Sequence, residues 1–156
     1  MKKILITGGA GYIGSAILSS NRPGSITVFD NLYWNQGSLV YPLLKSYRFF
    51  NESILKWSDA LKREIESADV IIPLAALVGA PLCDQEPEMA EELNYLWFKN
   101  LINHLDKQLV VYPNTNSGYG TTGDTVCTED TPTNPISLYG KTKQKTEELL
   151  LDSYDN

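Results

Sequence analysis

The chain has 156 residues, of which 42% are hydrophobic and 21% charged, values typical of one globular domain spanning residues 1–156. Its formal net charge of −6 disfavours binding of nucleic acid through a basic surface, and its apolar runs are too short to span a bilayer. Cys83 and Cys127 match neither a metal site nor a disulfide framework, and the N-terminal apolar run is too brief for a signal peptide. We therefore expect a cytoplasmic protein with two reduced thiols.

The first predicted strand, residues 4–6, leads into a glycine-rich turn at residues 7–14 and then into a helix. This order is the context of a dinucleotide-binding fingerprint. Gly8 can take the tight turn, Gly11 leaves the backbone open to a pyrophosphate, and Gly14 lets the helix pack close to the sheet. The phosphates would meet free N–H groups at the positive end of the helix dipole. A plain structural turn is the alternative, because the spacing is G-x-x-G-x-x-G.

The second predicted strand covers residues 26–29 and ends at Asp30. A carboxylate at this point, about 20 residues beyond the glycine turn, can accept hydrogen bonds from the adenosine ribose hydroxyls. It would repel a 2′-phosphate, and no Lys or Arg follows it in residues 31–33, so the sequence favours NAD over NADP. Alternatively, Asp30 forms a turn or caps a helix.

Residues 31–46 are expected to form a loop and a short helix over the sheet. In this interpretation Tyr33, Trp34 and Tyr41 pack the segment against the sheet, and Pro42 interrupts any longer helix.

Two further strands are predicted at residues 47–50 and 69–72. Between them Trp57, Leu61 and Ile65 recur every four residues, which predicts an amphipathic helix.

Small residues follow the fourth predicted strand and suit close approach of the backbone to a ligand, although they also simply pack well. A long helix is predicted from Met89 to Leu105, and His104 near its end is expected to be a surface residue favoured by the helix dipole. The fifth predicted strand covers residues 109–112, and a last helix starts near Ser137.

Strand and helix alternate five times, which implies an α/β fold with a doubly wound parallel sheet and right-handed crossovers. Ligands of such sheets bind beyond the carboxyl ends of the strands, where the strand order reverses. Gly8, Asp30, Ala75 and Thr115 all follow predicted strands, so we expect them to converge on one crevice.

Tyr139 and Lys143 are four residues apart and therefore share one face of the last helix. A nearby ammonium stabilises a phenolate and lowers the pKa of the tyrosine, which would make Tyr139 usable in proton transfer. Thr115 could hydrogen-bond a substrate oxygen beside it. Alternatively, Tyr139 packs as an aromatic at the helix start and Lys143 is solvated.

Together these motifs resemble the extended short-chain dehydrogenase/reductases, and more narrowly the NAD-dependent nucleotide-sugar epimerase/dehydratases. The resemblance implies a Rossmann fold that holds NAD, with Tyr139 as catalytic acid/base, Lys143 binding the nicotinamide ribose and tuning Tyr139, and Thr115 as the family's Ser/Thr. It implies that a sugar carbon of a nucleotide-sugar is oxidised and later reduced again. The cofactor-binding residues it implies are Gly8, Gly11, Tyr12, Ile13, Gly14, Asp30, Asn31, Ser53, Ile54, Leu74, Ala75, Ala76, Tyr139 and Lys143.

The chain departs from the family pattern at several positions. Asn116-Ser117 replaces the Asp-Glu pair of dehydratases, so epimerisation or simple redox chemistry is favoured over elimination. Ser53 stands where an Asp usually contacts adenine, Pro73 where a His often occurs, and Trp97 where a small Gly is common.

The resemblance implies a protein about twice as long, with a C-terminal substrate domain that we expect to be absent from these 156 residues. We therefore expect a fragment, or a chain that forms a homo-oligomer or works with a partner chain, with its fifth strand exposed as a sheet edge. The alternative to a nucleotide-sugar epimerase or oxidoreductase is a truncated NAD-binding module without turnover. A third interpretation, binding of RNA, is disfavoured by the acidic charge.

Overall fold

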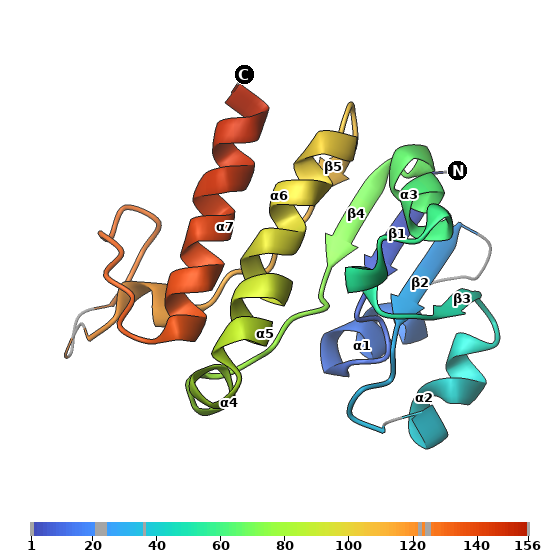
Figure 1. The fold of residues 1–156 in the computed structure, drawn as a ribbon, viewed down its shortest axis with the longest axis horizontal. Coiled ribbons are helices and arrows are strands. Elements are labelled where there is room, and N and C mark those ends of the chain that lie inside the picture. The colour runs from blue at the N-terminus through green and yellow to red at the C-terminus, as the bar shows by residue number, and fades with distance from the viewer. Residues whose placement is uncertain (1, 21–24, 36, 122, 124–125, 156) are drawn as a thin grey trace. The chain divides into compact units, whose positions relative to one another are not determined.

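Five parallel strands form one sheet in the computed structural model, which describes residues 2–20, 25–35, 37–121, 123 and 126–155. The strand order is β3-β2-β1-β4-β5 and every neighbouring pair is parallel (Figure 1). The order reverses between β1 and β4, which confirms the predicted doubly wound, Rossmann-like sheet. The strands are β1 (Ile4–Thr7), β2 (Ile26–Asp30), β3 (Arg48–Asn51), β4 (Val70–Pro73) and β5 (Leu109–Val110).

Strand β5 is shorter than the four residues predicted for it, and it lies at one end of the strand order, as expected. The Val111 N–H still donates to the Ile71 carbonyl at 2.9 Å. Pro113, two residues further on, has no N–H to continue such pairing.

The chain divides into two compact units, and each is described by itself. The first unit comprises Met1–Ala75 and His104–Pro113 and holds the whole sheet; the second comprises Ala76–Asn103 and Asn114–Asn156. The single domain expected over residues 1–156 stays a prediction.

Helices cover both faces of the sheet in the first unit. They are α1 (Tyr12–Ser20), α2 (Gly37–Leu44) and α3 (Asp59–Ser67). Ile6 and Val28 belong to the same buried cluster as Leu18 of α1 and Leu44 of α2. Because side chains alternate along a strand, Thr27 points to the opposite face, where its hydroxyl donates to Glu64 of α3 at 3.0 Å.

The segment after β2 does not pack as the sequence suggested. Tyr33, Trp34 and Tyr41 have exposed fractions of 57%, 59% and 45%, so the expectation that they pack against the sheet was wrong. Pro42 lies inside α2, and the helix continues for two residues beyond it. The residues of this segment that do pack against the buried cluster are Leu32, Val40 and Leu43.

Helix α3 contains only two of the three residues that predicted it. Leu61 and Ile65 are fully buried in α3, and Ser58 caps the helix by accepting the Leu61 N–H at 3.2 Å. Trp57 precedes the helix and adopts a left-handed φ of 47° at the end of the 3₁₀ turn Ile54–Lys56. Its ring stacks on His104 with centroids 5.4 Å apart, and His104 is half-buried by this contact.

The second unit consists of helices, and its predicted long helix is broken into several elements. They are α4 (Ala80–Gln85), α5 (Pro87–Glu91), a π-helical turn (Glu92–Leu96) and α6 (Trp97–Leu101), followed by the 3₁₀ turn Ile102–His104. Pro87 starts α5, as expected for a residue without an N–H to donate. Helix α4, absent from the prediction, buries Cys83.

The last helix is the longest in the described chain. It is α7 (Leu138–Asp155), it begins beside the predicted Ser137, and a 3₁₀ turn, Asn116–Tyr119, precedes it in the same unit (Figure 1). Lys145 of α7 lies 3.5 Å from the carboxylate of Glu91 on α5. The Thr146 hydroxyl donates to the Asn94 carbonyl of the π-helical turn at 2.6 Å, which holds α7 beside that turn.

Candidate functional site

The glycine turn begins at a position, residue 8, that only glycine can occupy without strain. Gly8 has a φ of +72°, and a Cβ there would lie 2.4 Å from the Ala75 backbone nitrogen. The Gly8 N–H donates to the Phe29 carbonyl at 2.7 Å, while the Leu74 N–H donates to the Thr7 carbonyl at 2.9 Å. The ends of β1, β2 and β4 are therefore joined at this turn, and the predicted role of Gly8 in a tight turn agrees with its conformation.

The close backbone approaches at the other glycines of the turn differ from those predicted. A Cβ on Gly9 would lie 2.5 Å from Val28, so Gly9 makes the close approach to the sheet that was assigned to Gly14. Gly14 instead lets α1 close on the turn, because its Cβ would lie 2.5 Å from the Gly9 Cα. A Cβ on Gly11 would approach only the Gly8 carbonyl oxygen, at 3.2 Å, so the outer side of Gly11 is open. The close approach of Gly9 to the sheet could have been predicted from the consecutive glycines Gly8-Gly9.

Asp30 lies at the end of β2 with both carboxylate oxygens in hydrogen bonds. Its Oδ2 accepts the Ala10 N–H at 2.9 Å and its Oδ1 accepts the Leu32 N–H at 2.8 Å. The residue is 8% exposed. The alternative interpretation of Asp30 as a turn former is therefore correct, and each oxygen keeps a second lone pair. Ribose binding by Asp30 stays a prediction.

The remaining residues predicted to contact the cofactor differ in exposure. Tyr12 and Ile13 open α1 and are exposed. The Asn31 side chain accepts the Tyr33 N–H at 3.2 Å, and Ser53 accepts the Leu55 N–H at 3.3 Å.

Ile54 is buried, and Ala75 donates a long hydrogen bond of 3.5 Å to the Thr7 hydroxyl. Leu74 belongs to the cluster between sheet and helices. Ala76 falls in the second unit. Within the first unit, the structure thus brings together Gly8, Leu74 and Ala75.

The three predicted catalytic residues all lie in the second unit. Tyr139 packs against a small apolar cluster that contains Leu77 and Cys83. Burial raises the pKa of Tyr139, and a hydrogen bond with the Thr115 side chain opposes this effect. Gly140 lets α7 lie against the 3₁₀ turn that follows Thr115, because a Cβ there would lie 2.7 Å from the Ser117 carbonyl oxygen.

Lys143 is buried, not solvated as the alternative interpretation had it, with an exposed fraction of 4%. Burial lowers the pKa of Lys143 to about 8. The sequence predicted that an ammonium would lower the pKa of Tyr139, but that pKa is raised, and burial is the largest cause. Desolvation penalises the charged form of both groups, so it opposes both the phenolate and the ammonium.

Asn94 is a buried polar residue that sequence reasoning did not select. Its side chain accepts the Leu77 N–H at 2.8 Å and donates to the Leu77 carbonyl at 2.9 Å. The Cys83 thiol donates to the same carbonyl at 3.3 Å. Asn94 lies within the π-helical turn, a distortion often found near functional sites. No spacing in the sequence indicates such a turn.

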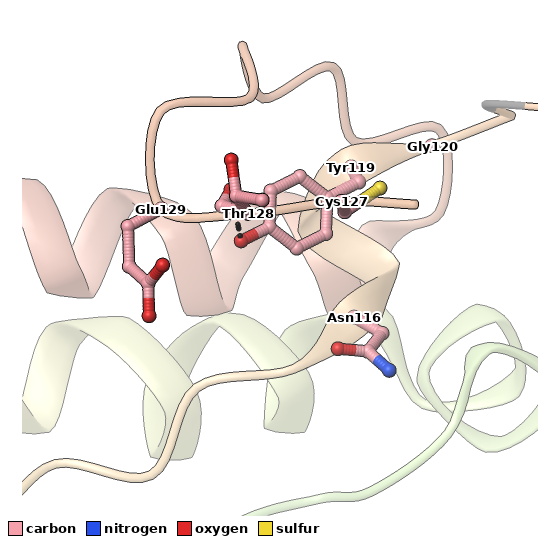
Figure 2. Close-up of a pocket in the computed structure, with 6 residues that line it drawn as sticks. All are labelled: Asn116, Tyr119, Gly120, Cys127, Thr128 and Glu129. Carbon is pink, nitrogen blue, oxygen red and sulfur yellow. Dashed lines mark hydrogen bonds between the residues drawn. The ribbon is translucent and has the colours of Figure 1, made fainter. Parts of the chain in front are cut away.

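A pocket of about 460 Å³ lies beside the 3₁₀ turn in the second unit (Figure 2). The Tyr119 hydroxyl donates to the Thr128 carbonyl at 3.1 Å and so ties the turn to the following loop (Figure 2). The lining residues are Asn116, Tyr119, Gly120, Cys127, Thr128 and Glu129. The pocket therefore carries the amide of Asn116, which directly follows Thr115, together with the thiol of Cys127 and the carboxylate of Glu129.

The sequence matches the model of the NAD dependent epimerase/dehydratase family over residues 4–155. The chain belongs to this family. The cofactor of the family is NAD, and the members most similar to this chain include sugar-nucleotide epimerases. The resemblance inferred from the motifs is confirmed.

Three similar proteins are each about twice as long as this chain. UDP-glucose 4-epimerase of Lactobacillus helveticus is 31% identical over 153 residues, which cover 95% of this chain and 46% of that protein. The UDP-Glc/GlcNAc 4-epimerase of Campylobacter jejuni has a TM-score of 0.84 at 29% identity, over 99% of this chain and 50% of that one. UDP-glucuronic acid 4-epimerase of Bacillus cereus in complex with NAD has a TM-score of 0.83 at 26% identity, with 99% and 53% covered. The chain thus spans about half the length of these relatives.

The remaining expectations concern membrane spans, the two cysteines, metal binding, location and oligomeric state. None of the described helices combines the length and apolarity needed to cross a membrane. Within the described ranges, Cys83 and Cys127 are not joined in a disulfide, and no cluster of three or more His, Cys, Asp or Glu residues could hold a metal ion. The cytoplasmic location and the homo-oligomer or partner chain stay predictions.

Proposed function

We propose that this chain provides the NAD-binding and proton-transfer residues of a nucleotide-sugar epimerase. The observation that carries the proposal is the hydrogen bond of Tyr139 with Thr115 in an apolar setting, on the helix that also buries Lys143. The similar proteins named as UDP-sugar 4-epimerases support a nucleotide-sugar as the substrate class.

The glycine turn of the first unit fits a dinucleotide. Gly11 is open on its outer side, and the start of α1 directs backbone N–H groups at the space beyond it. Asp30 keeps lone pairs for the adenosine ribose, with no Lys or Arg in residues 25–35 to attract a 2′-phosphate. NAD, when bound, supplies the acceptor and donor of the hydride exchanged with a sugar carbon.

The chemistry assigned to the protein itself is proton transfer. The Tyr139 oxygen takes the proton from a sugar hydroxyl as that carbon is oxidised, and returns it when the carbon is reduced. Thr115 holds the same oxygen by hydrogen bonding. Because burial raises the pKa of Tyr139, a phenolate at neutral pH needs a nearby positive charge, and Lys143 is the residue one turn away that supplies it. Asn116 and Ser117 provide no carboxylate for elimination, which favours epimerisation.

Calorimetry with NAD and with NADP tests the cofactor part of the proposal. We expect NAD to bind about tenfold tighter or more, because Asp30 would repel a 2′-phosphate at close range. Lys143→Met should weaken NAD binding, because the ammonium would also hold the nicotinamide ribose. Tyr139→Phe is the matched control and should leave NAD affinity almost unchanged, since the phenol acts on the substrate. Equal affinities for NAD and NADP would contradict the assignment of Asp30.

A further inference from the structure

Two aromatic rings stand exposed directly after Asp30. Tyr33 and Trp34 have exposed fractions of 57% and 59%, and their rings meet edge to face with centroids 4.9 Å apart. Aromatic side chains dominate the energetics of cores and binding surfaces. Two exposed aromatic rings in contact therefore favour a surface that binds a ligand or partner.

The backbone that presents the pair is held in an unusual conformation. Leu32 and Asn35, on either side of the pair, both have a φ of 53°, which is uncommon for residues other than glycine. The Asn35 N–H donates to the Leu32 carbonyl at 2.9 Å, and Asn31 accepts the Tyr33 N–H. Leu32 packs against the buried cluster below. Local strain that several contacts maintain is a feature of ligand-binding segments.

The loop is also tied to the glycine turn. The Asp30 carboxylate accepts the Ala10 N–H of that turn through Oδ2 and the Leu32 N–H of the loop through Oδ1. The aromatic pair therefore begins three residues from the group expected to hold the adenosine ribose. The described residues 25–35 contain no Lys or Arg, so the loop suits an uncharged ring rather than a phosphate.

We propose that Trp34, supported edge-on by Tyr33, stacks on the adenine ring of the dinucleotide. This inference rests on the proposed function, because it assumes that the glycine turn binds NAD. A purine stacked on an indole gains dispersion and π-stacking contacts that need no hydrogen bond from the protein. The exposed pair would thus be covered by the cofactor, and part of the selectivity for an adenine nucleotide would lie in this loop.

Tryptophan fluorescence can test the proposal, because the chain has three tryptophans in distinct surroundings. Trp97 is 1% exposed and Trp57 is stacked on His104, whereas Trp34 is largely exposed. Titration with AMP should quench emission and protect it from iodide, and nicotinamide mononucleotide should not. Trp34→Phe should remove the AMP-dependent change, whereas Trp57→Phe should keep it.

Calorimetry of AMP binding supplies the second readout. Trp34→Ala should weaken AMP binding about tenfold, the order expected for one base on one aromatic ring, without weakening nicotinamide mononucleotide binding. Tyr41→Ala, which removes an exposed aromatic of α2, is the matched control and should bind AMP like the unchanged chain. If the chain binds NAD but Trp34→Ala binds AMP unchanged, the stacking proposal is overturned and the proposed function stands. If the unchanged chain binds neither NAD nor AMP, the proposed function itself fails.

Discussion

Burial decides the chemistry of individual residues in this chain. Tyr139 and Lys143 lie one helical turn apart, and both have pKa values displaced toward the neutral form by desolvation. At neutral pH such a pair starts from a neutral phenol and an ammonium, because a pKa of about 8 leaves Lys143 mostly protonated. The phenolate forms only when binding adds interactions that favour it, which would confine proton transfer to the loaded state.

The lowered pKa of Lys143 predicts a pH dependence of stability. In the unfolded chain the pKa of Lys143 is near its usual 10.5, and in the folded chain it is about 8. Between these values the unfolded state binds more protons, so the free energy of unfolding should rise with pH, by about 2 kcal/mol from about pH 8 to about pH 10. Urea unfolding across this range measures the effect. Lys143→Met should show a flatter profile, and an equally steep rise in that variant would contradict the assignment.

Individual elements depend on close backbone approaches. The turn after β1 needs Gly8 because its φ is positive and because the Ala75 backbone leaves no room for a Cβ. The start of α7 needs Gly140 for its approach to the turn after Thr115. In both places, two segments far apart in sequence meet through a missing side chain.

A pair of glycine substitutions separates steric crowding from backbone strain. Gly8→Ala should lower the free energy of unfolding by several kcal/mol, because it combines a positive φ with a Cβ only 2.4 Å from a backbone nitrogen. Gly123→Ala is the matched control: its φ is +61° and, among the described residues, no atom is found within 4 Å of its Cβ position, so strain alone should cost about 1 kcal/mol. Denaturant unfolding compares the two variants. Equal losses would show that crowding at Gly8 is unimportant.

At the scale of the whole molecule, length is the main contrast with the family. The chain covers 46% of UDP-glucose 4-epimerase of Lactobacillus helveticus and 50% of the Campylobacter jejuni enzyme. Remote contacts to a substrate contribute much of the orientation that catalysis requires.

We therefore expect the 156-residue chain, tested by itself, to bind NAD but to epimerise UDP-glucose with little or no turnover. A coupled assay for UDP-galactose, with a full-length family member as positive control, measures this. Adding the C-terminal half of a family member as a separate chain should raise the rate, provided that it folds. Robust turnover by the chain alone would show that its own residues suffice to orient the substrate.

The sequence by itself determined the parallel sheet, the glycine turn and the family. Residues 4–6 and 26–29 are mostly buried, and such short runs rich in β-branched and apolar residues, bounded by turn residues, favour strands. The turn around Gly8 requires particular backbone conformations at particular positions, and such a local requirement can be recognised from the spacing of glycines in the sequence. Tyr139 and Lys143 were found for the same reason, since four-residue spacing sets a helix face.

Only the tertiary structure decided how these residues are surrounded. The burial of Lys143, the raised pKa of Tyr139 and the clamp of Asn94 on Leu77 depend on segments distant in sequence. The breaks in the predicted long helix and the exposure of Trp34 were likewise visible only in the structure. Apolar periodicity shows which side chains can be buried, but packing against other segments determines which of them are, because burial is a property of contacts and not of composition.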